Sequence, residues 1–569
     1  MFFNSNGSDE VSFDAIVVGT GVSGGWAAKE LSEKGLKTLV LERGRDVKHV
    51  VDYPTANMDI WEFPNNDRFS KEVLDRDYPK QNRSGYTIRP STKHWWPKDH
   101  EHPYTETKPF DWLRGYHVGG RSLLWGRQSY RLSPMDFEAN GKEGVAVDWP
   151  IRYQDIAPWY DYVESHAGIS GRAEGLPQLP DGKFLPAMDF TCIEQHVATK
   201  IKENFNDRIM TIGRTANLTQ PHKGRGACQY RNRCIRGCPY GGYFSSQAST
   251  LPGAYASGNM TLKPDSIVTE LIYDEETQKA KGVRVLDRET GEWREYFAKV
   301  IFLCASSFGS TWIMMNSKSD RFPNGFGNDS DQLGRNVMDH HFRLGANGST
   351  DMFADKYFKG RRPNGIYIPR FVNLNAKTKK KEYLRGWGYQ GGGRRQGWYR
   401  DVKELDFGPE LKAQLAQPGA WTMGMTGFGE CLPYEENRIT LNEEVKDIHG
   451  LPTLTMDVEW KDNEYAMRKD MTIEAAEILE AAGLKNVKTY DAGCNPGLGI
   501  HEMGTARMGR DPKTSVLNAH NQVHAAKNVY VTDGACMTSS GCQNPSLTYM
   551  ALTARAADHA VKALNNNDI

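Results

Sequence analysis

The chain has 569 residues, which is too long for one hydrophobic core and predicts two or more joined domains. Its 71 basic and 71 acidic residues balance, which excludes the basic field of a nucleic-acid-binding protein. Nine cysteines are too few for a disulfide scaffold. We expect no membrane-spanning helix, because no run of eighteen residues is apolar. The N-terminus shows no signal-peptide pattern, so the chain is expected in the cytoplasm unless a partner subunit carries an export signal.

The N-terminal segment has the pattern of a dinucleotide-binding unit. Its apolar pattern predicts a strand, a helix and a second strand, at residues 14–20, about 23–34 and 38–41. Three glycines between the first strand and the helix have the spacing G-x-G-x-x-G, namely Gly19, Gly21 and Gly24. They permit a tight turn and let a pyrophosphate approach the N–H groups of the helix, while Glu42 accepts hydrogen bonds from ribose hydroxyls. The alternative is a Rossmann-like unit without a ligand.

The C-terminal part of the chain favours FAD over NAD as the dinucleotide. Residues 527–532 are expected to form a strand that ends at Asp533 and Gly534, and a helix rich in Ala and Leu is expected from about 545 to 565. A late strand followed by Asp-Gly is typical of FAD enzymes, where the pair lies near the flavin end of the cofactor. Residues 300–310 add a further strand, turn and helix. The FAD domain is therefore expected to be discontinuous.

A glycine-rich loop carries three cysteines in the spacing C-x5-C-x3-C, namely Cys228, Cys234 and Cys238. Three thiolates this close together can hold an iron–sulfur cluster, and three local ligands favour a three-iron centre. Neighbouring arginines would favour such an anionic centre; they are Arg225, Arg231, Arg233 and Arg236. Two alternatives stay open: a zinc site with a distant fourth ligand, and cysteines that bind no metal. His222 is a further candidate ligand, or else an ordinary exposed loop histidine.

Several motifs in a fixed order resemble the GMC (glucose–methanol–choline) oxidoreductases over almost the whole chain. After the N-terminal fingerprint these are VGGRSLLWG at 118–126, LGRNVMDH at 333–340, NRITLN at 437–442, HEMGTARMG at 501–509 and NPSLT at 544–548. Within the family the chain resembles the FAD and iron–sulfur subunits of bacterial sugar dehydrogenases, of the glucoside 3-dehydrogenase, gluconate 2-dehydrogenase and glucose dehydrogenase types. Those subunits have a similar three-cysteine insertion.

The resemblance implies an α/β fold in which a discontinuous Rossmann-like FAD-binding domain joins an antiparallel-sheet substrate domain with helices on one side. We assign the FAD-binding domain to residues 1–50, 111–130, 225–340 and 491–569, with the cysteine loop at 224–242. We assign the substrate domain to residues 51–110, 131–224 and 341–490. In this domain the alternating segments 438–442 and 454–460 are expected to be antiparallel strands of its sheet, and a helix is expected from about 464 to 482. The resemblance also implies a [3Fe-4S] cluster, a small helper subunit with a twin-arginine export signal, and a cytochrome c acceptor. Location in the periplasm would follow from export with that subunit, and the cytoplasm is the alternative.

Two residues are expected to carry the chemistry. Oxidation of a secondary alcohol removes the hydroxyl proton and transfers a hydride to flavin N5, and a neutral histidine suits the first event. By the resemblance His501 is this base and Asn544 its partner. The alternative for Asn544 is the N-cap of the last helix. His340 and His341 are expected to be structural.

The flavin ring is expected to lie against residues 119–125. By the resemblance Gly119 and Gly120 let the backbone approach the ring, Ser122 offers a hydrogen bond near N5 or O4, and Asp533 and Gly534 contact the ribityl and pyrophosphate parts. In some relatives a histidine in this stretch bonds the flavin covalently. Leu124 occupies the equivalent position here, so noncovalent FAD is expected.

The expected function is an FAD-dependent sugar dehydrogenase that oxidises the C3 hydroxyl of glucosides, with gluconate or glucose oxidation as the alternative. An iron–sulfur relay suits a dehydrogenase, whereas an oxidase passes electrons to oxygen directly. An oxidase, a flavin-containing lyase and a non-catalytic electron-transfer subunit are the other classes considered. Aromatic side chains beside polar groups suit a sugar ring.

Overall fold

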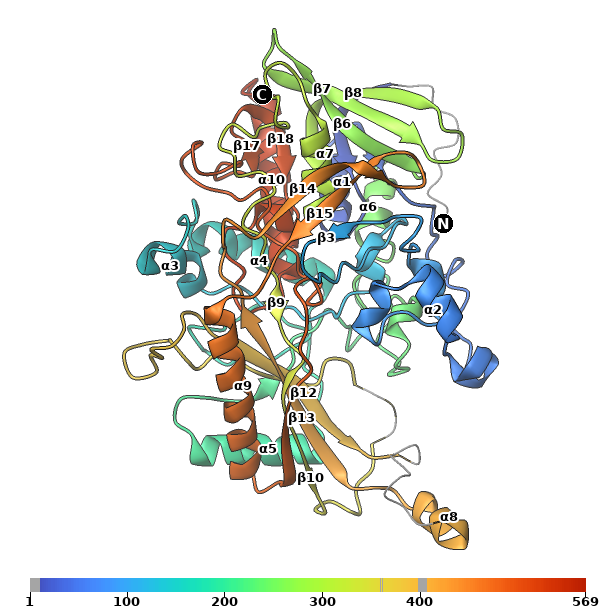
Figure 1. The fold of residues 1–569 in the computed structure, drawn as a ribbon, viewed down its shortest axis with the longest axis vertical. Helices are drawn as coiled ribbons and strands as arrows, with labels where there is room; N and C mark the ends of the chain where they lie inside the picture. The colour runs from blue at the N-terminus through green and yellow to red at the C-terminus, as the bar shows by residue number, and fades with distance from the viewer. Residues whose placement is uncertain (1–10, 359, 361, 398–406) are drawn as a thin grey trace.

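The computed structural model describes residues 11–358, 360, 362–397 and 407–569. Two sheet-containing lobes lie one above the other in Figure 1, with the C-terminus in the upper lobe. Residues 1–10 lie outside the described part. The expected absence of a signal peptide and the assigned start of the FAD-binding domain concern these residues.

An eight-stranded sheet forms the first lobe. Its main path runs β17-β18-β8-β1-β2-β5, and β6 and β7 extend it through antiparallel pairs. The strands are β1 Ser12–Val18, β2 Thr38–Leu41, β5 Met260–Lys263, β6 Ser266–Asp274, β7 Lys279–Asp287, β8 Trp293–Leu303, β17 Gln522–Val523 and β18 Ala526–Val531. The pairs β18–β8, β8–β1, β1–β2 and β2–β5 are parallel. Segments from both ends and the middle of the chain therefore share one sheet, as expected for a discontinuous dinucleotide-binding domain.

Helices cover this sheet because its parallel strands are buried on both faces. They are α1 Val22–Glu33, α4 Tyr153–Ala167, α6 Thr250–Ala256, α7 Ser307–Asn316 and α10 Ser546–Asn565. Helix α1 contacts α6 and α10, and α10 contacts α4. The strand–helix–strand unit at the N-terminus and the last helix agree with the sequence prediction to within about two residues.

A second, antiparallel sheet forms the other lobe. Its strand order is β16-β10-β13-β12-β11-β4, and β9 pairs with β13. The strands are β4 Thr211–Ile212, β9 His340–His341, β10 Leu344–Thr350, β11 Ile366–Ile368, β12 Trp387–Arg395, β13 Trp421–Glu430 and β16 Lys485–Asp491. Two helices that contact each other pack on this sheet, α5 Cys192–Asn204 and α9 Asp462–Ala481. The expected antiparallel sheet with helices on one side is confirmed (Figure 1).

A small third sheet packs with the first lobe, although its three strands lie within the substrate domain that we assigned. It contains β3 Thr105–Glu106, β14 Arg438–Lys446 and β15 Pro452–Asp457. The sequence predicted β14 and β15 as strands of the substrate sheet, yet the side chains of Ile439, Leu454 and Met456 pack in the core of the first lobe. Helix α4, which we assigned to the substrate domain, packs in the same core. An alternating pattern predicts a strand but not the sheet that the strand joins.

The remaining helices are short. They are η1 Ile60–Glu62, η2 Pro64–Asn66, α2 Lys71–Asp77, η3 Gln81–Ser84, η4 Lys93–Trp95, η5 Gly120–Leu123, α3 Pro134–Glu143, η6 Cys234–Arg236, α8 Gly408–Ala416 and η8 Gly534–Cys536. Within the described ranges, no helix has both the length and the apolar character needed to cross a membrane.

Candidate active site

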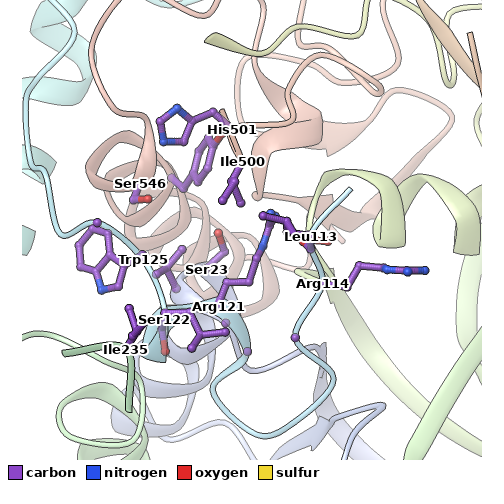
Figure 2. Close-up of a pocket in the computed structure, with 18 of the residues that line it drawn as sticks. Ser23, Leu113, Arg114, Arg121, Ser122, Trp125, Ile235, Ile500, His501 and Ser546 are labelled. Carbon is purple, nitrogen blue, oxygen red and sulfur yellow. The ribbon is translucent and has the colours of Figure 1, made fainter. Parts of the chain in front are cut away.

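A cavity of about 760 Å³ connects the nucleotide-binding end of the first sheet with the second sheet and the cysteine loop. Most of the predicted site residues line it: Gly19, Gly21, Glu42, Gly120, Ser122, Cys228, Cys234, Cys238, His501, Asp533, Gly534 and Asn544. Gly24 and Gly119 are not among the residues that line it. Figure 2 shows the central part of the cavity, where His501, Ser546, Trp125 and Arg121 face a common space.

The glycines of the N-terminal fingerprint make close backbone packing possible. Gly19 has a φ of +95°, and a Cβ there would lie 2.5 Å from the carbonyl oxygen of Cys304. A Cβ on Gly24 would overlap the carbonyl of Gly19, so the helix start could not lie as close to the turn. Around Gly21 the described residues place nothing within 4 Å of a Cβ, which leaves open space at the N-terminus of α1. This cradle fits a pyrophosphate bound by helix N–H groups.

Glu42 is a buried carboxylate that already serves the protein as an acceptor. It accepts hydrogen bonds from the Thr20 N–H at 3.1 Å, the Thr20 hydroxyl at 2.5 Å and the Gly44 N–H at 3.0 Å. Burial raises its pKa to about 7, although these hydrogen bonds act in the opposite direction. Because it lines the cavity beside Gly19 and Gly21, Glu42 has the position required of a ribose acceptor.

The loop predicted to carry the flavin is tied to the nucleotide-binding turn. The Gly119 N–H donates to the Thr20 hydroxyl oxygen at 2.8 Å. The Ser122 hydroxyl donates to the Gly119 carbonyl at 2.6 Å and accepts from the Ser246 N–H at 3.0 Å. The Ser122 hydroxyl hydrogen is therefore used within the loop, in its bond to the Gly119 carbonyl. Leu124 lines the cavity with a side chain that cannot form a covalent flavin bond.

The Asp533-Gly534 pair lies at the same cavity. The Asp533 carboxylate accepts from the Ala535 N–H at 3.0 Å and the Ser310 hydroxyl at 2.5 Å, and burial raises its pKa to about 6. A Cβ on Gly534 would overlap the carbonyl of Glu502, so the residue after Asp533 must be glycine for the two segments to pack. The pair is therefore a rigid corner of the cavity wall.

His501 lies on a loop that one carboxylate organises. Asp339 accepts hydrogen bonds from the N–H groups of Gly497, Gly499 and His501 at 2.8, 2.9 and 3.1 Å. The preceding residue, Ile500, has a φ of +60°, which is a strained backbone conformation for a β-branched residue. Burial lowers the pKa of His501 well below its usual value, so the ring is neutral near pH 7. A neutral, precisely held histidine facing a cavity suits a general base.

The side chain of His501 contacts one residue that we predicted and one that we did not. The Asn544 amide nitrogen lies 3.4 Å from His501 Nε2. His340 Nδ1 lies 2.7 Å from His501 Nδ1, although the sequence assigned His340 a structural role. The two histidines are 161 residues apart in the chain, so no local sequence pattern indicated this contact.

Asn544 is held from the second sheet and does not cap the last helix. Gln390 on β12 donates from Nε2 to the Asn544 Oδ1 at 2.5 Å. Pro545 occupies the N-cap position of α10, and no side-chain cap is found there among the described residues. The N-cap alternative for Asn544 is therefore wrong. Gln390 also lines the cavity, and so the second sheet reaches the candidate base.

An ion pair that the sequence did not reveal lies beside the candidate base. The Arg121 guanidinium contacts both carboxylate oxygens of Glu502, at 3.0 and 2.8 Å. Arg121 follows the two glycines of the flavin loop, and Glu502 follows His501 (Figure 2 shows Arg121 near His501). The pair therefore joins the loop of the candidate base to the predicted flavin loop.

The three loop cysteines line the same cavity but do not form a ready metal site. Two of their sulfurs accept backbone N–H groups, Cys228 from Tyr230 at 3.5 Å and Cys238 from Gly242 at 3.4 Å. Over the described ranges, no group of three or more His, Cys, Asp or Glu side chains is arranged to hold a metal ion. The three thiols can thus act as iron ligands, but they are not arranged as a bound cluster requires.

The residues expected to surround the cysteines have other partners. His222 Nε2 lies 2.9 Å from the Ser165 carbonyl oxygen, a contact outside the cysteine loop. The arginine side chains of the loop bond to backbone carbonyls elsewhere: Arg225 to Ala167, Arg231 to Ala56, Arg233 to Asn57 and Arg236 to Met58. Arg233 also pairs with Asp59. These arginines anchor the loop to the neighbouring segment 56–59 and to α4.

Comparison with protein families identifies the family of the chain. Models of the GMC oxidoreductase N-terminal and C-terminal regions match residues 13–342 and 433–553. The chain belongs to the GMC oxidoreductase family. It is an FAD-dependent oxidoreductase that acts on CH–OH donors. The predicted family and the predicted FAD are confirmed.

Full-length relatives share about a quarter of their residues with the chain. The 2-methyl-1,2-propanediol dehydrogenase of Mycolicibacterium austroafricanum is 27% identical, covering 96% of this chain and 94% of the relative. The fructose dehydrogenase large subunit of Gluconobacter japonicus is 25% identical (97% and 98%). The gluconate 2-dehydrogenase flavoprotein of Pantoea cypripedii is 26% identical (95% and 92%). The formate oxidase of Aspergillus oryzae shares the fold with a TM-score of 0.62 and 14% identity, covering 99% of this chain and all of that one.

The cavity of this GMC oxidoreductase fits FAD at its nucleotide end and a hydroxyl-bearing substrate at its other end. FAD, when bound, supplies the acceptor for a hydride from carbon. The open space at Gly21 and the Glu42 carboxylate would hold its pyrophosphate and ribose. His501, neutral and fixed by Asp339, can take a proton from a hydroxyl, and Asn544 can donate a hydrogen bond to the same oxygen.

Proposed function

We propose that the protein is a dehydrogenase for sugars and that it oxidises the C3 hydroxyl of glucosides to a ketone. The His501–Asn544 pair carries this proposal, because it lines the cavity and is held from the second sheet by Gln390. Sugar names among full-length relatives, fructose and gluconate, support the substrate class. The motif resemblance to glucoside 3-dehydrogenases supports position C3.

The residues divide the reaction in a simple way. A substrate hydroxyl beside His501 Nε2 gives its proton to the ring, which is neutral and therefore ready to accept it. Asn544 orients the same hydroxyl through its amide N–H, and Gln390 keeps that amide turned toward His501. FAD, when bound, would supply the hydride acceptor, and Gly120 and Arg121 line the part of the cavity where its ring is expected. Arg121 is neutralised by Glu502 and so holds the loops in place.

A gluconate or glucose substrate is the second candidate, and it is favoured by the gluconate 2-dehydrogenase relative. Product identification separates the candidates. Holoenzyme is incubated with methyl α-glucoside and a dye acceptor, and the product is identified by NMR. A 3-keto glucoside supports the proposal. Oxidation of gluconate or glucose without oxidation of the glucoside would replace it by the second candidate, and oxygen consumption without dye would indicate an oxidase.

We also propose that Cys228, Cys234 and Cys238 hold a [3Fe-4S] cluster. The loop lies close to the flavin loop: the Tyr243 hydroxyl is 2.8 Å from the Leu123 carbonyl oxygen and 3.0 Å from that of Cys234. Because the thiols are not arranged as a metal site in the described conformation, the loop must close around the cluster, and we derive no step of the reaction through it. Iron and sulfide contents near three and four per chain, with a matching EPR signal, would support the cluster; iron-free holoenzyme would exclude it.

A cytochrome-type acceptor and a helper subunit complete the proposal. Relatives that are named as a large subunit and as a flavoprotein support an assembly with further subunits. We propose that a small partner carries an export signal and that the assembly acts in the periplasm. Affinity purification of the tagged chain from the periplasmic fraction tests both points. Recovery from the cytoplasm alone, without a partner, would contradict them.

A further inference from the structure

We propose that His340 is a positioning residue that fixes the tautomer of His501, so that the unprotonated Nε2 of His501 faces the substrate. The inference rests on the proposed role of His501 as the base and goes beyond it, because it states which ring nitrogen acts and what selects that nitrogen. The sequence placed His340 among the structural histidines.

The first step concerns the proton on His340. Its Nε2 lies 2.7 Å from the carbonyl oxygen of Gly541, and a carbonyl oxygen can only accept a hydrogen bond. His340 Nε2 must therefore carry a hydrogen. The residue is 1% exposed, and burial lowers the pKa of its ring to about 4, so the ring is neutral near pH 7. A neutral imidazole has one N–H, which leaves His340 Nδ1 as an acceptor.

The second step transfers this direction to His501. The two Nδ1 atoms lie 2.7 Å apart, so one of them must donate. Since His340 Nδ1 carries no hydrogen, His501 Nδ1 is the donor. His501 is also neutral, so its Nε2 carries a lone pair, and the residue lines the cavity. The order of donation runs from His501 Nδ1 to His340 Nδ1 and from His340 Nε2 to Gly541.

An independent contact agrees with this direction. Gln390 donates to Asn544 Oδ1 at 2.5 Å, so the NH2 group of Asn544 is the part of the amide that is turned toward His501. That group lies 3.4 Å from His501 Nε2 and presents a donor to it, which requires a lone pair on Nε2. The distance is long for a hydrogen bond, and a substrate hydroxyl can therefore take the lone pair on binding.

The opposite tautomer would stop proton removal. With the hydrogen on Nε2, His501 would donate to the substrate hydroxyl and could not accept its proton. The charged groups around His501 do not set the ring proton: Asp339 bonds its backbone N–H, and Arg121 and Glu502 pair with each other. His340 is the group at hydrogen-bond distance from His501 Nδ1, so it is the group that selects the tautomer.

Two substitutions separate positioning from mere packing. His340→Phe keeps a ring of similar size but has no acceptor for His501 Nδ1–H. His340→Asn places an amide oxygen near the position of Nδ1 and keeps an acceptor. Loss of general-base assistance costs roughly 100-fold or more, so we expect flavin reduction to slow by about this factor in His340→Phe and by much less in His340→Asn. KM and bound FAD should stay nearly unchanged.

The experiment uses holoenzyme labelled with 15N-histidine, with anaerobic flavin reduction by methyl α-glucoside measured in parallel. His501→Gln identifies the His501 signals. We expect hydrogen on Nδ1 of His501 in the wild type and His340→Asn, and a shift of hydrogen toward Nε2 in His340→Phe. His196→Phe is a matched control, because His196 also bonds a carbonyl, that of Ala482, but lies far from the cavity.

Hydrogen on Nε2 of His501 in the wild type, or an unchanged His501 tautomer in His340→Phe, would overturn the inference. Equal slowing of both His340 variants with unchanged signals would show a packing role. If His340→Phe does not retain FAD, His340→Leu takes its place, because leucine is smaller than phenylalanine and offers no acceptor to His501 Nδ1–H. An unchanged reduction rate in His501→Ala would refute the base itself, while the 15N signals still test the His340 contact.

Discussion

Replacement of Glu42 by Gln tests the nucleotide end of the cavity. The carboxylate accepts three hydrogen bonds from Thr20 and Gly44 and must also accept from a ribose hydroxyl. The glutamine amide keeps one acceptor oxygen, and its NH2 group would face one of the donor groups of Thr20 or Gly44. The substitution removes one charge-assisted hydrogen bond to the ribose, worth about 1.5–3 kcal/mol. We therefore expect the Kd for FAD to rise roughly 10- to 100-fold.

The pH dependence of FAD binding gives a second, sharper signature. Burial raises the pKa of Glu42 to about 7, so the carboxylate form predominates only above this pH. A raised pKa also means that ionisation costs the FAD-free fold stability as the pH rises toward 7. Because the ribose needs an acceptor, the wild-type Kd should fall between pH 6 and 8. The Gln variant does not titrate, and its Kd should stay nearly flat.

The assay is titration of FAD-free protein by quenching of flavin fluorescence. Glu480→Gln on the exposed side of α9 is the matched control, since it makes the same chemical change far from the cavity. Chemical denaturation of the FAD-free variants shows whether the fold is kept. A Kd for Glu42→Gln within about twofold of the wild type at pH 8 would refute the assignment of Glu42 as the ribose acceptor.

Three further predictions concern other parts of the site. Flavin reduction by substrate should be constant from pH 6.5 to 8 and fall only at lower pH, because burial lowers the pKa of His501 below 6.5 and the base is lost when it is protonated; a fall above pH 7 contradicts this. Cys234→Ser should lose iron and electron transfer to cytochrome c while substrate still reduces the flavin, and retained iron would remove Cys234 from the cluster. Gly24→Ala should destabilise the FAD-free protein by about 1–3 kcal/mol, whereas Gly21→Ala should leave that stability unchanged and weaken FAD binding; denaturation curves with equal midpoints for both variants would contradict the packing argument.

The nucleotide-binding unit and the family were readable in the sequence because local patterns specify them. The glycine spacing, the apolar strand before it and the acid at Glu42 all lie within about thirty residues. The long helix predicted at about 464–482 is α9 at Asp462–Ala481, since helix periodicity is a local signal. His501 and Asn544 were found through motifs and not through their contact.

Long-range contacts were not readable. His340 and Gln390 lie more than 100 residues from the partners that they orient, and no local pattern marks such pairs. The arginines of the cysteine loop looked like a positive shell, but segment 56–59 supplies carbonyl oxygens to three of them. Likewise β14 and β15 were recognised as strands, while their sheet partner β3 lies over 300 residues earlier in the chain.

The central claim is that His501 removes a proton from a sugar hydroxyl while the flavin is reduced. The most direct test mixes wild-type and His501→Ala holoenzyme, both with FAD bound, anaerobically with methyl α-glucoside and follows the flavin absorbance. The account predicts rapid bleaching of the wild type with formation of a 3-keto glucoside, and bleaching at least roughly 100-fold slower in the variant. Bleaching of both proteins at the same rate, or of neither protein, would contradict it.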